Sequence, residues 1–329
     1  MSRPITAPCL VAALLTTLQT VALAQIGAVE EAKLLHAPEE VQDAFGWAVA
    51  IDGELAAVGA PQPGMHWLPP RPGFVVVYEQ RPSGWVEAHH LQGSTAQDHD
   101  HFGFALDLAG DTLFVGAPQF NYGGPTGPGK VHVFERTPGA WTEVAELAAA
   151  SPLGDMDLFG YDVCFDGERL YVGAPALGAS YPSGRVHVLR AVPGGWLEEA
   201  VLEASATTIQ PNEFGSSVDV SGRTLVVGAP GVDAVYVFER SGGAWTEVQR
   251  LDGTGTFGTS VAVDGEHLLV GAPRHGPQAE GATFAFVRSA SWQLAGPLGR
   301  TDVQPFDAFG CAIALEDGVA VIGAHEDYH

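Results

Sequence analysis

One short motif recurs six times along the 329-residue sequence and constrains its fold more than any other feature. The motif is a Phe-Gly pair followed about 14 residues later by Gly-Ala, which is usually Gly-Ala-Pro. The Phe-Gly pairs begin at Phe45, Phe102, Phe159, Phe214, Phe257 and Phe309. Recurrence at intervals of about 43 to 57 residues indicates a chain built from one repeated supersecondary unit.

Each repeat predicts four short strands. Large and small side chains alternate from the Phe-Gly pair onward, as in Trp47–Ile51, and this period of two indicates a strand with two different faces. Dipeptides such as Asp52-Gly53 follow and indicate hairpin turns. The second strand ends at Gly-Ala-Pro, the third contains segments such as Val131–Phe134, and the fourth runs from a Trp to a Leu, as from Trp141 to Leu147.

Four antiparallel strands at a period near 50 predict an all-β chain folded as a β-propeller of six four-stranded blades, with seven blades as the alternative. The N-terminal segment Ala28–Leu34 matches the fourth-strand segment Trp196–Leu202. We therefore expect an N-terminal strand to close the ring and hide a sheet edge. Residues 25–329 are expected to form a single propeller domain whose last blade is incomplete, because two strands follow Phe309.

The Phe-Gly and Gly-Ala-Pro motifs resemble those of the FG-GAP repeat family, whose best-known members form the propeller of integrin α-subunits. The chain looks like a secreted FG-GAP repeat protein of bacterial type. The resemblance covers essentially the whole chain after residue 24. It implies a propeller that engages its partners through one face. The family's calcium loop is not matched, because its hairpin is reduced here to short turns such as Asp166–Glu168. Calcium takes six to eight oxygens, so no cofactor is expected, although calcium elsewhere stays open.

Residues 1–24 are predicted to be a cleaved signal peptide. Arg3 precedes an apolar stretch that runs to Val21, and Ala22-Leu-Ala24 matches a small-residue cleavage site. The protein is therefore expected to be secreted or extracytoplasmic. A formal net charge of −24 excludes nucleic acid as a partner. No second apolar run is long enough to span a bilayer, so membrane insertion is not expected.

The connections after each Gly-Ala-Pro are the longest and most varied of the chain, and up-and-down blades place them on one face. Binding residues on rigid scaffolds usually lie on such loops. Aromatic residues that the repeat does not explain occur there, and aromatic rings can stack on sugars or anchor a protein. The candidate ligand-binding residues are Trp67, Phe120, Tyr122 and Tyr181.

Acidic residues precede several of the Phe-Gly pairs. We interpret Asp98, Asp100, Asp155 and Asp157 as acceptors for backbone groups of the entry turn, with a cation site as the alternative. His99 and His101 alternate with the first two, which leaves a transition-metal site conceivable. The histidines of the third strands, His132 and His187, are expected to be exposed strand positions.

The sequence contains no recognisable catalytic motif such as Gly-x-Ser-x-Gly or His-Glu-x-x-His. We therefore expect a secreted, non-enzymatic interaction or adhesion module that binds protein or glycan through the long-loop face. The alternative is an extracellular carbohydrate-active hydrolase or lyase with its site in the central pocket. The abundance of carboxylates keeps that alternative open, because glycoside chemistry needs a pair of them.

Overall fold

The computed structural model describes residues 34, 44–61, 71–119, 127–152, 154, 156–176, 183–205, 211–299 and 304–324. Described strands group into sheets in chain order. The first two sheets contain β1 (Val49–Asp52), β2 (Leu55–Ala60), β3 (Phe74–Arg81) and β4 (Gly84–Leu91), then β5 (Ala105–Ala109), β6 (Thr112–Ala117), β7 (Lys130–Thr137) and β8 (Ala140–Leu147). The third contains β9 (Asp162–Phe165), β10 (Arg169–Ala174), β11 (Arg185–Val192) and β12 (Gly195–Leu202).

The remaining sheets continue the series. The fourth contains β13 (Ser217–Ser221), β14 (Thr224–Ala229), β15 (Ala234–Ser241) and β16 (Ala244–Asp252), with the short 3-10 helix η1 (Pro230–Val232) before β15. The fifth contains β17 (Ser260–Asp264), β18 (His267–Ala272), β19 (Ala282–Arg288) and β20 (Trp292–Pro297), and β21 (Ile313–Glu316) pairs with β22 (Val319–Ile322). Among the described residues, no helix combines the length and apolar character needed to cross a membrane.

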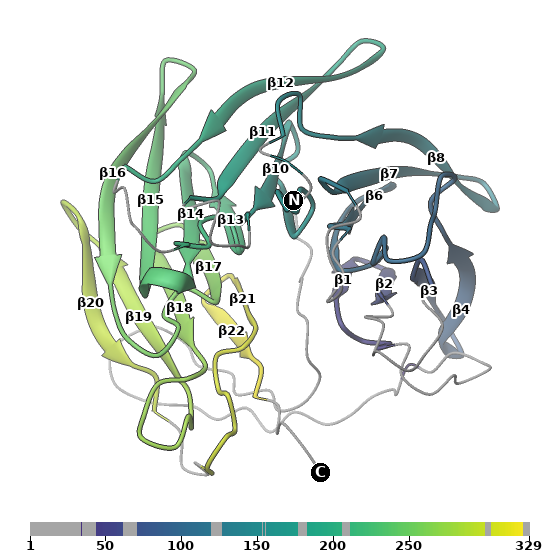
Figure 1. Ribbon diagram of the computed structural model, residues 1–329. Helices are drawn as coiled ribbons and strands as arrows, with labels where there is room; N and C mark the ends of the chain where they lie inside the picture. Colours follow the sequence, from purple (N-terminus) through teal and green to yellow (C-terminus); the bar gives the residue numbers. More distant parts are fainter. Residues whose placement is uncertain are drawn as a thin grey trace. The chain divides into compact units, whose positions relative to one another are not determined.

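Strands that are consecutive in the chain are neighbours in every sheet, which is the topology of a propeller blade (Figure 1). In the first sheet, for example, Val58 on β2 pairs with Val49 on β1 and with Val76 on β3, both antiparallel. The predicted all-β class and the four-stranded repeat are therefore confirmed for five sheets, and two strands of the last are described.

The chain divides into two compact units, whose boundary crosses the third sheet. The first unit takes its described residues from Val29–Val172 and Leu189–Glu199, and so holds the first and second sheets. The second takes them from Gly173–Val188 and Ala200–His329, and holds the fourth and fifth sheets and the β21–β22 pair. That residues 25–329 form one domain stays a prediction.

The Phe-Gly pair does not start the first strand, as the sequence suggested, but forms a turn three or four residues before it. The phenylalanine is buried, as Phe102 is, and the glycine has a positive φ, which is 92° at Gly103. The backbone N–H of Gly103 donates to the carbonyl of Gly116, the first residue of Gly-Ala-Pro, at 3.1 Å. Gly116 in turn lies against the backbone of Gly160, the Phe-Gly glycine of the next sheet. The glycines of the Phe-Gly and Gly-Ala-Pro motifs thus allow the backbones of adjacent sheets to come into close contact.

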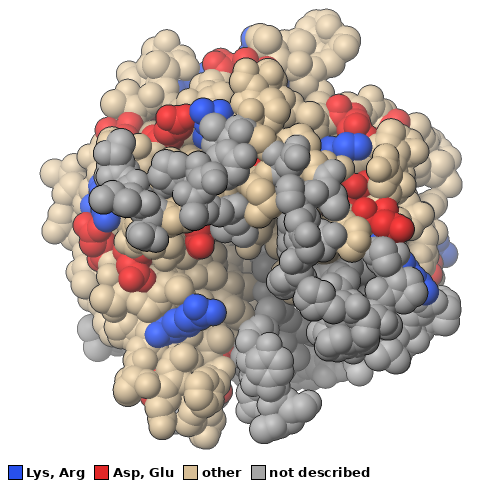
Figure 2. Space-filling view, in the orientation of Figure 1, with Lys and Arg blue, Asp and Glu red and all other residues tan. Residues whose placement is uncertain are grey.

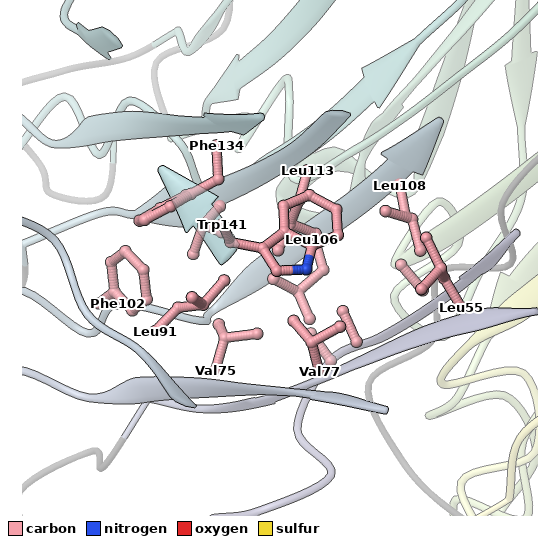
Figure 3. Packing of buried hydrophobic residues seen from close by; sticks show 14 of the residues in the cluster. Leu55, Val75, Val77, Leu91, Phe102, Leu106, Leu108, Leu113, Phe134 and Trp141 are labelled. Carbon is pink, nitrogen blue, oxygen red and sulfur yellow. The ribbon is translucent and has the colours of Figure 1, made fainter. Parts of the chain in front are cut away.

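Apolar side chains of the first and second sheets interlock in one core. Figure 3 shows Val75, Val77 and Leu91 of the first sheet opposite Leu106 and Trp141 of the second. The predicted alternation of small and large side chains on opposite faces of the first strand is confirmed. Ala48 and Ala50 lie in this core, whereas Val49 and Ile51 pack against a separate cluster. Leu34 also packs against that second cluster. Comparable cores join the fourth sheet to the fifth and the fifth to β21–β22.

Carboxylates of the first strands cap the backbone of the following sheet. Oδ2 of Asp107 on β5 accepts the backbone N–H of Phe165 on β9 at 2.5 Å. Oδ2 of Asp219 on β13 likewise accepts the N–H of Val263 on β17 at 2.6 Å. An unpaired backbone N–H at a buried sheet edge is costly, so these aspartates satisfy groups that strand pairing leaves open.

The few basic side chains are largely engaged with the abundant acidic ones. On the face seen in Figure 2, several Lys and Arg side chains lie beside Asp and Glu. Arg136 on β7, for example, reaches Glu79 on β3 of the first sheet at 2.6 Å, and Arg169 on β10 lies 2.6 Å from Glu199 on β12. The 15 basic residues against 39 acidic ones still leave a strongly negative protein.

Candidate functional site: a histidine–glutamate group on the second sheet

A β-bulge in the second sheet brings one histidine and two glutamates together. His132 on β7 pairs in register with Glu146 on β8. Residues three apart on a regular strand, such as Glu143 and Glu146, point to opposite faces. The register shifts after Val133, where β8 carries Val144 as an extra residue. A bulge of this kind reorients the strand, and both glutamates consequently reach His132.

The imidazole of His132 is buried and held in place. Its Nδ1 lies 2.7 Å from Oε1 of Glu143 and 4.0 Å from Oε2 of Glu146. The ring meets that of Phe102 edge-on at a centroid distance of 5.2 Å, and Gly93 covers it so closely that a side chain there would strike the imidazole. The side chain of Glu146 is 33% exposed, so the group opens to the surface on the Glu146 side.

Lys130 and Thr95 complete the group on its exposed side. Nζ of Lys130 lies 3.3 Å from Oε1 of Glu146 and donates to the hydroxyl of Thr95 at 3.1 Å. The Thr95 hydroxyl donates to Oε2 of Glu146. Burial alone would raise the pKa of Glu146, but the hydrogen bond from Thr95 and the ammonium of Lys130 outweigh it and lower that pKa. The carboxylate of Glu146 is therefore ionised at neutral pH.

One contact of this group recurs in the fourth sheet and belongs to the repeat architecture. The backbone N–H of Ser94, in the connection that enters the second sheet, donates to Oε2 of Glu143 at 2.6 Å. Ser205 and Glu247 make the same contact for the fourth sheet, with the N–H at 2.9 Å and the serine hydroxyl at 2.7 Å. The fourth-strand glutamate thus ties down a connection, which is a structural role.

The other members of the group are not required by the repeat. Tyr236 and Arg250 pair in register in the fourth sheet where His132 and Glu146 pair in the second. There the guanidinium of Arg250 lies over the ring of Tyr236 at 5.5 Å. Because a sheet of the same design forms with that pair, His132 and Glu146 need a different explanation.

The sequence-predicted site residues lie elsewhere. Trp67, Phe120, Tyr122 and Tyr181, and the metal candidate Asp155, fall outside the described residues, so the first four stay predictions as ligand contacts. Asp98 is exposed and Asp100 is buried. The carboxylate of Asp100 accepts the backbone N–H of Gln97 and the side-chain amide of Gln119, each at 2.8 Å. Asp157 is buried, and its backbone N–H donates to the carbonyl of Gly154 in a turn.

The expectation that His132 and His187 are exposed was wrong, since both are fully buried. At His132, Glu143 of the outer strand and Gly93 of the entering connection cover the ring, which alternation alone does not reveal. Within the described residues, the histidine and carboxylate atoms close enough to share one ion belong to His132, Glu143 and Glu146. A Trp-x-Glu-x-x-Glu spacing opposite a histidine was the available sequence signal.

The sheets define a repeat protein built from β-propeller blades. Residues 28–64, 85–134 and 196–244 match the FG-GAP repeat family. The chain carries FG-GAP repeats, as its Phe-Gly and Gly-Ala-Pro words indicated. No curated protein matches the sequence.

Solved structures share the fold. A protein of Bacteroides uniformis assigned as a 6-phosphogluconolactonase matches with a TM-score of 0.54 and 11% identity over 84% of this chain and 79% of its own. A second protein assigned as a 6-phosphogluconolactonase, from Bacteroides fragilis, matches with a TM-score of 0.52 and 11% identity over 78% of this chain and 71% of its own. The periplasmic gluconolactonase of Pseudomonas aeruginosa matches with a TM-score of 0.51 and 18% identity over 78% of this chain and 72% of its own. These neighbours overturn the expectation of a non-enzymatic interaction module, although at such identities the likeness itself establishes the fold alone.

Proposed function

We propose that this chain is an extracytoplasmic hydrolase that opens sugar-derived lactones, with its reactive groups at His132, Glu143 and Glu146. The fold neighbours named as lactonases suggest the reaction class, and one of them is periplasmic. This is the carbohydrate-active alternative raised by the sequence, moved from the central pocket to the outer strands of the second sheet. The leader-like residues 1–24 support the extracytoplasmic location.

The observation that carries the proposal is the clustering of two carboxylates, an imidazole and an ammonium at a partly exposed position. Lactone opening adds the oxygen of water to the carbonyl carbon and breaks the ring C–O bond, and the ring oxygen leaves as a hydroxyl after taking a proton. A base must accept a proton from the water, and positive charge must stabilise the oxyanion that forms. Carboxylates and a histidine supply the first need, and Lys130, 3.3 Å from Glu146, supplies the second.

The inner strands offer less support for a central site. Asp107 and Asp219 use their carboxylates on backbone N–H groups of the next sheet. Proton transfer by either would break a contact that holds neighbouring first strands. In the second-sheet group, Glu143 accepts the backbone N–H of Ser94, whereas Glu146 contacts the side chains of Thr95 and Lys130.

We also propose that the blades close into a ring of six, with the segment ending at Leu34 as the outer strand of the last blade. Leu91, at the end of β4, packs in the core that its sheet shares with the following one. Leu34 packs against the first-sheet cluster that contains Val58 and Val76. That contact supports a fourth strand preceding the first sheet.

The test is hydrolysis of glucono-1,5-lactone and 6-phosphogluconolactone by the purified chain, followed by acid release and corrected for spontaneous opening. Glu143→Gln and Glu247→Gln form a matched pair, because each weakens the same serine contact but only the first touches the proposed site. Turnover that Glu143→Gln lowers at least about tenfold and Glu247→Gln leaves unchanged supports the proposal. No turnover of either lactone, or equal loss in both variants, contradicts it.

A further inference from the structure

We infer that His132, Glu143 and Glu146 bind one divalent transition-metal ion of the zinc class. The inference deepens the proposed function, on which the catalytic use of the ion rests, but binding itself is measured without turnover. The three donor atoms all lie within 4.8 Å of one another. None of the repeat words predicts this site, and the sequence led us to expect no cofactor.

The spacing of the donors fits a small ion. Zinc takes nitrogen and oxygen ligands at about 2.0–2.2 Å in tetrahedral geometry, which separates neighbouring donors by roughly 3.3–3.6 Å. Nδ1 of His132 lies 2.7 Å from Glu143 and 4.0 Å from Glu146, on either side of that range. Moving these two separations into the range takes shifts of roughly 0.6 Å for Glu143 and 0.4 Å for Glu146, and Glu146 would exchange its contacts with Thr95 and Lys130 for the ion.

The chemistry of the donors selects the metal. Calcium and magnesium prefer sites made of oxygen alone and take six or more ligands, whereas an imidazole with carboxylates suits zinc and its neighbours. Three protein ligands with an open fourth position characterise catalytic zinc sites. Glu146 is the most exposed of the three ligands, so water would reach a bound ion from its side. A metal-bound water ionises near neutral pH and would supply a hydroxide nucleophile there.

Lys130 predicts the direction in which metal affinity should change when its charge is removed. Its ammonium lies 3.3 Å from Oε1 of Glu146 and would compete with a metal for the same negative charge. Removing the ammonium should therefore tighten metal binding, whereas a purely structural ion pair would gain nothing from its loss. A unit charge about 4 Å away in a partly exposed setting interacts strongly enough that Lys130→Gln should tighten zinc binding by roughly fivefold or more.

The repeat itself supplies the control. Glu247 ties down Ser205 as Glu143 ties down Ser94, but Tyr236 and Arg250 stand in place of the other two ligands. The fourth sheet therefore reproduces the structural contact without the metal ligands. Glu247→Gln is expected to leave metal binding unchanged.

The experiment is isothermal titration of metal-stripped full chain with zinc chloride, repeated with cobalt chloride, whose visible absorption reports four-coordinate geometry. We expect one equivalent of tight binding that Glu146→Gln weakens at least about tenfold and Lys130→Gln strengthens. Because Glu146 is partly exposed, the Glu146→Gln variant should keep the fold, and circular dichroism checks that it does. Binding that is absent, or that is the same in wild type and Glu146→Gln, overturns the inference.

The two proposals can fail separately. Zinc binding at these residues without lactone turnover retains the metal site and removes the proposed function. Lactone turnover that survives complete metal removal retains the function and removes the metal site.

Discussion

Substituting Gly116 by alanine tests whether the Gly-Ala-Pro word exists to let adjacent sheets touch through their backbones. A Cβ built on Gly116 would overlap the carbonyl oxygen of Gly160 and lie 3.1 Å from its carbonyl carbon and 3.1 Å from Cβ of Ala105. The obstacle is backbone, which has no rotamer by which to escape, so the second and third sheets must move apart locally. Overpacking in a well-packed core typically costs about 1–3 kcal/mol, and we place Gly116→Ala at about 3 kcal/mol because the backbone yields least.

Gly110→Ala in the β5–β6 hairpin is the matched control. Gly110 has a φ of 58° and nothing within 4 Å of its built Cβ, so alanine there meets only the left-handed backbone cost of about 1 kcal/mol. Both substitutions reduce unfolded-chain entropy equally, so that effect cancels. Guanidinium unfolding followed by circular dichroism should show Gly116→Ala losing about 2 kcal/mol more than Gly110→Ala. Equal losses would refute the close-contact explanation of the motif.

Three further outcomes follow from the packing and the charges. Trp141→Ala should destabilise by about 3–5 kcal/mol because the indole fills the core between the first two sheets, whereas exposed Val144→Ala should change stability by less than about 0.5 kcal/mol; similar losses in both would contradict the core assignment. Asp107→Ala should cost about 1–3 kcal/mol by leaving the N–H of Phe165 uncapped; an unchanged denaturation midpoint would refute that cap. The lowered pKa of Glu146 means that its stabilising contribution is complete above its usual pKa of 4.5 and is lost as pH falls through the lower folded-state value. Glu146→Gln should flatten the acid limb of the stability profile in that window, and an identical profile would contradict it.

The fold could be predicted because the determinants of a blade are local and repeated six times. Alternation such as Trp47–Ile51, the Asp52-Gly53 turn and the Trp-to-Leu fourth strand each specify one element within a few residues. What alternation missed was the role of Phe-Gly, which lies in a turn before the strand because residues such as His101 and Gly103 adopt positive φ values of 55° and 92°.

The candidate site could not be predicted for two physical reasons. A β-bulge at Val144 turns Glu143 and Glu146 to one side of the strand, and strict alternation assigns them to opposite sides. His132 is buried because Gly93, in a connection about 40 residues earlier in the chain, covers its ring. Alternation around His132 reveals neither effect, and the Trp-x-Glu-x-x-Glu spacing of the next strand was the available signal, so the histidine looked like an exposed strand residue.

The most direct test of the account is an anomalous difference map, recorded at the zinc absorption edge, from crystals of the full chain grown with one equivalent of zinc. The account predicts a peak about 2.0–2.2 Å from Nδ1 of His132 and from one oxygen each of Glu143 and Glu146, with Lys130 moved away from Glu146. A map without a peak there, in which Lys130 still pairs with Glu146, would contradict it.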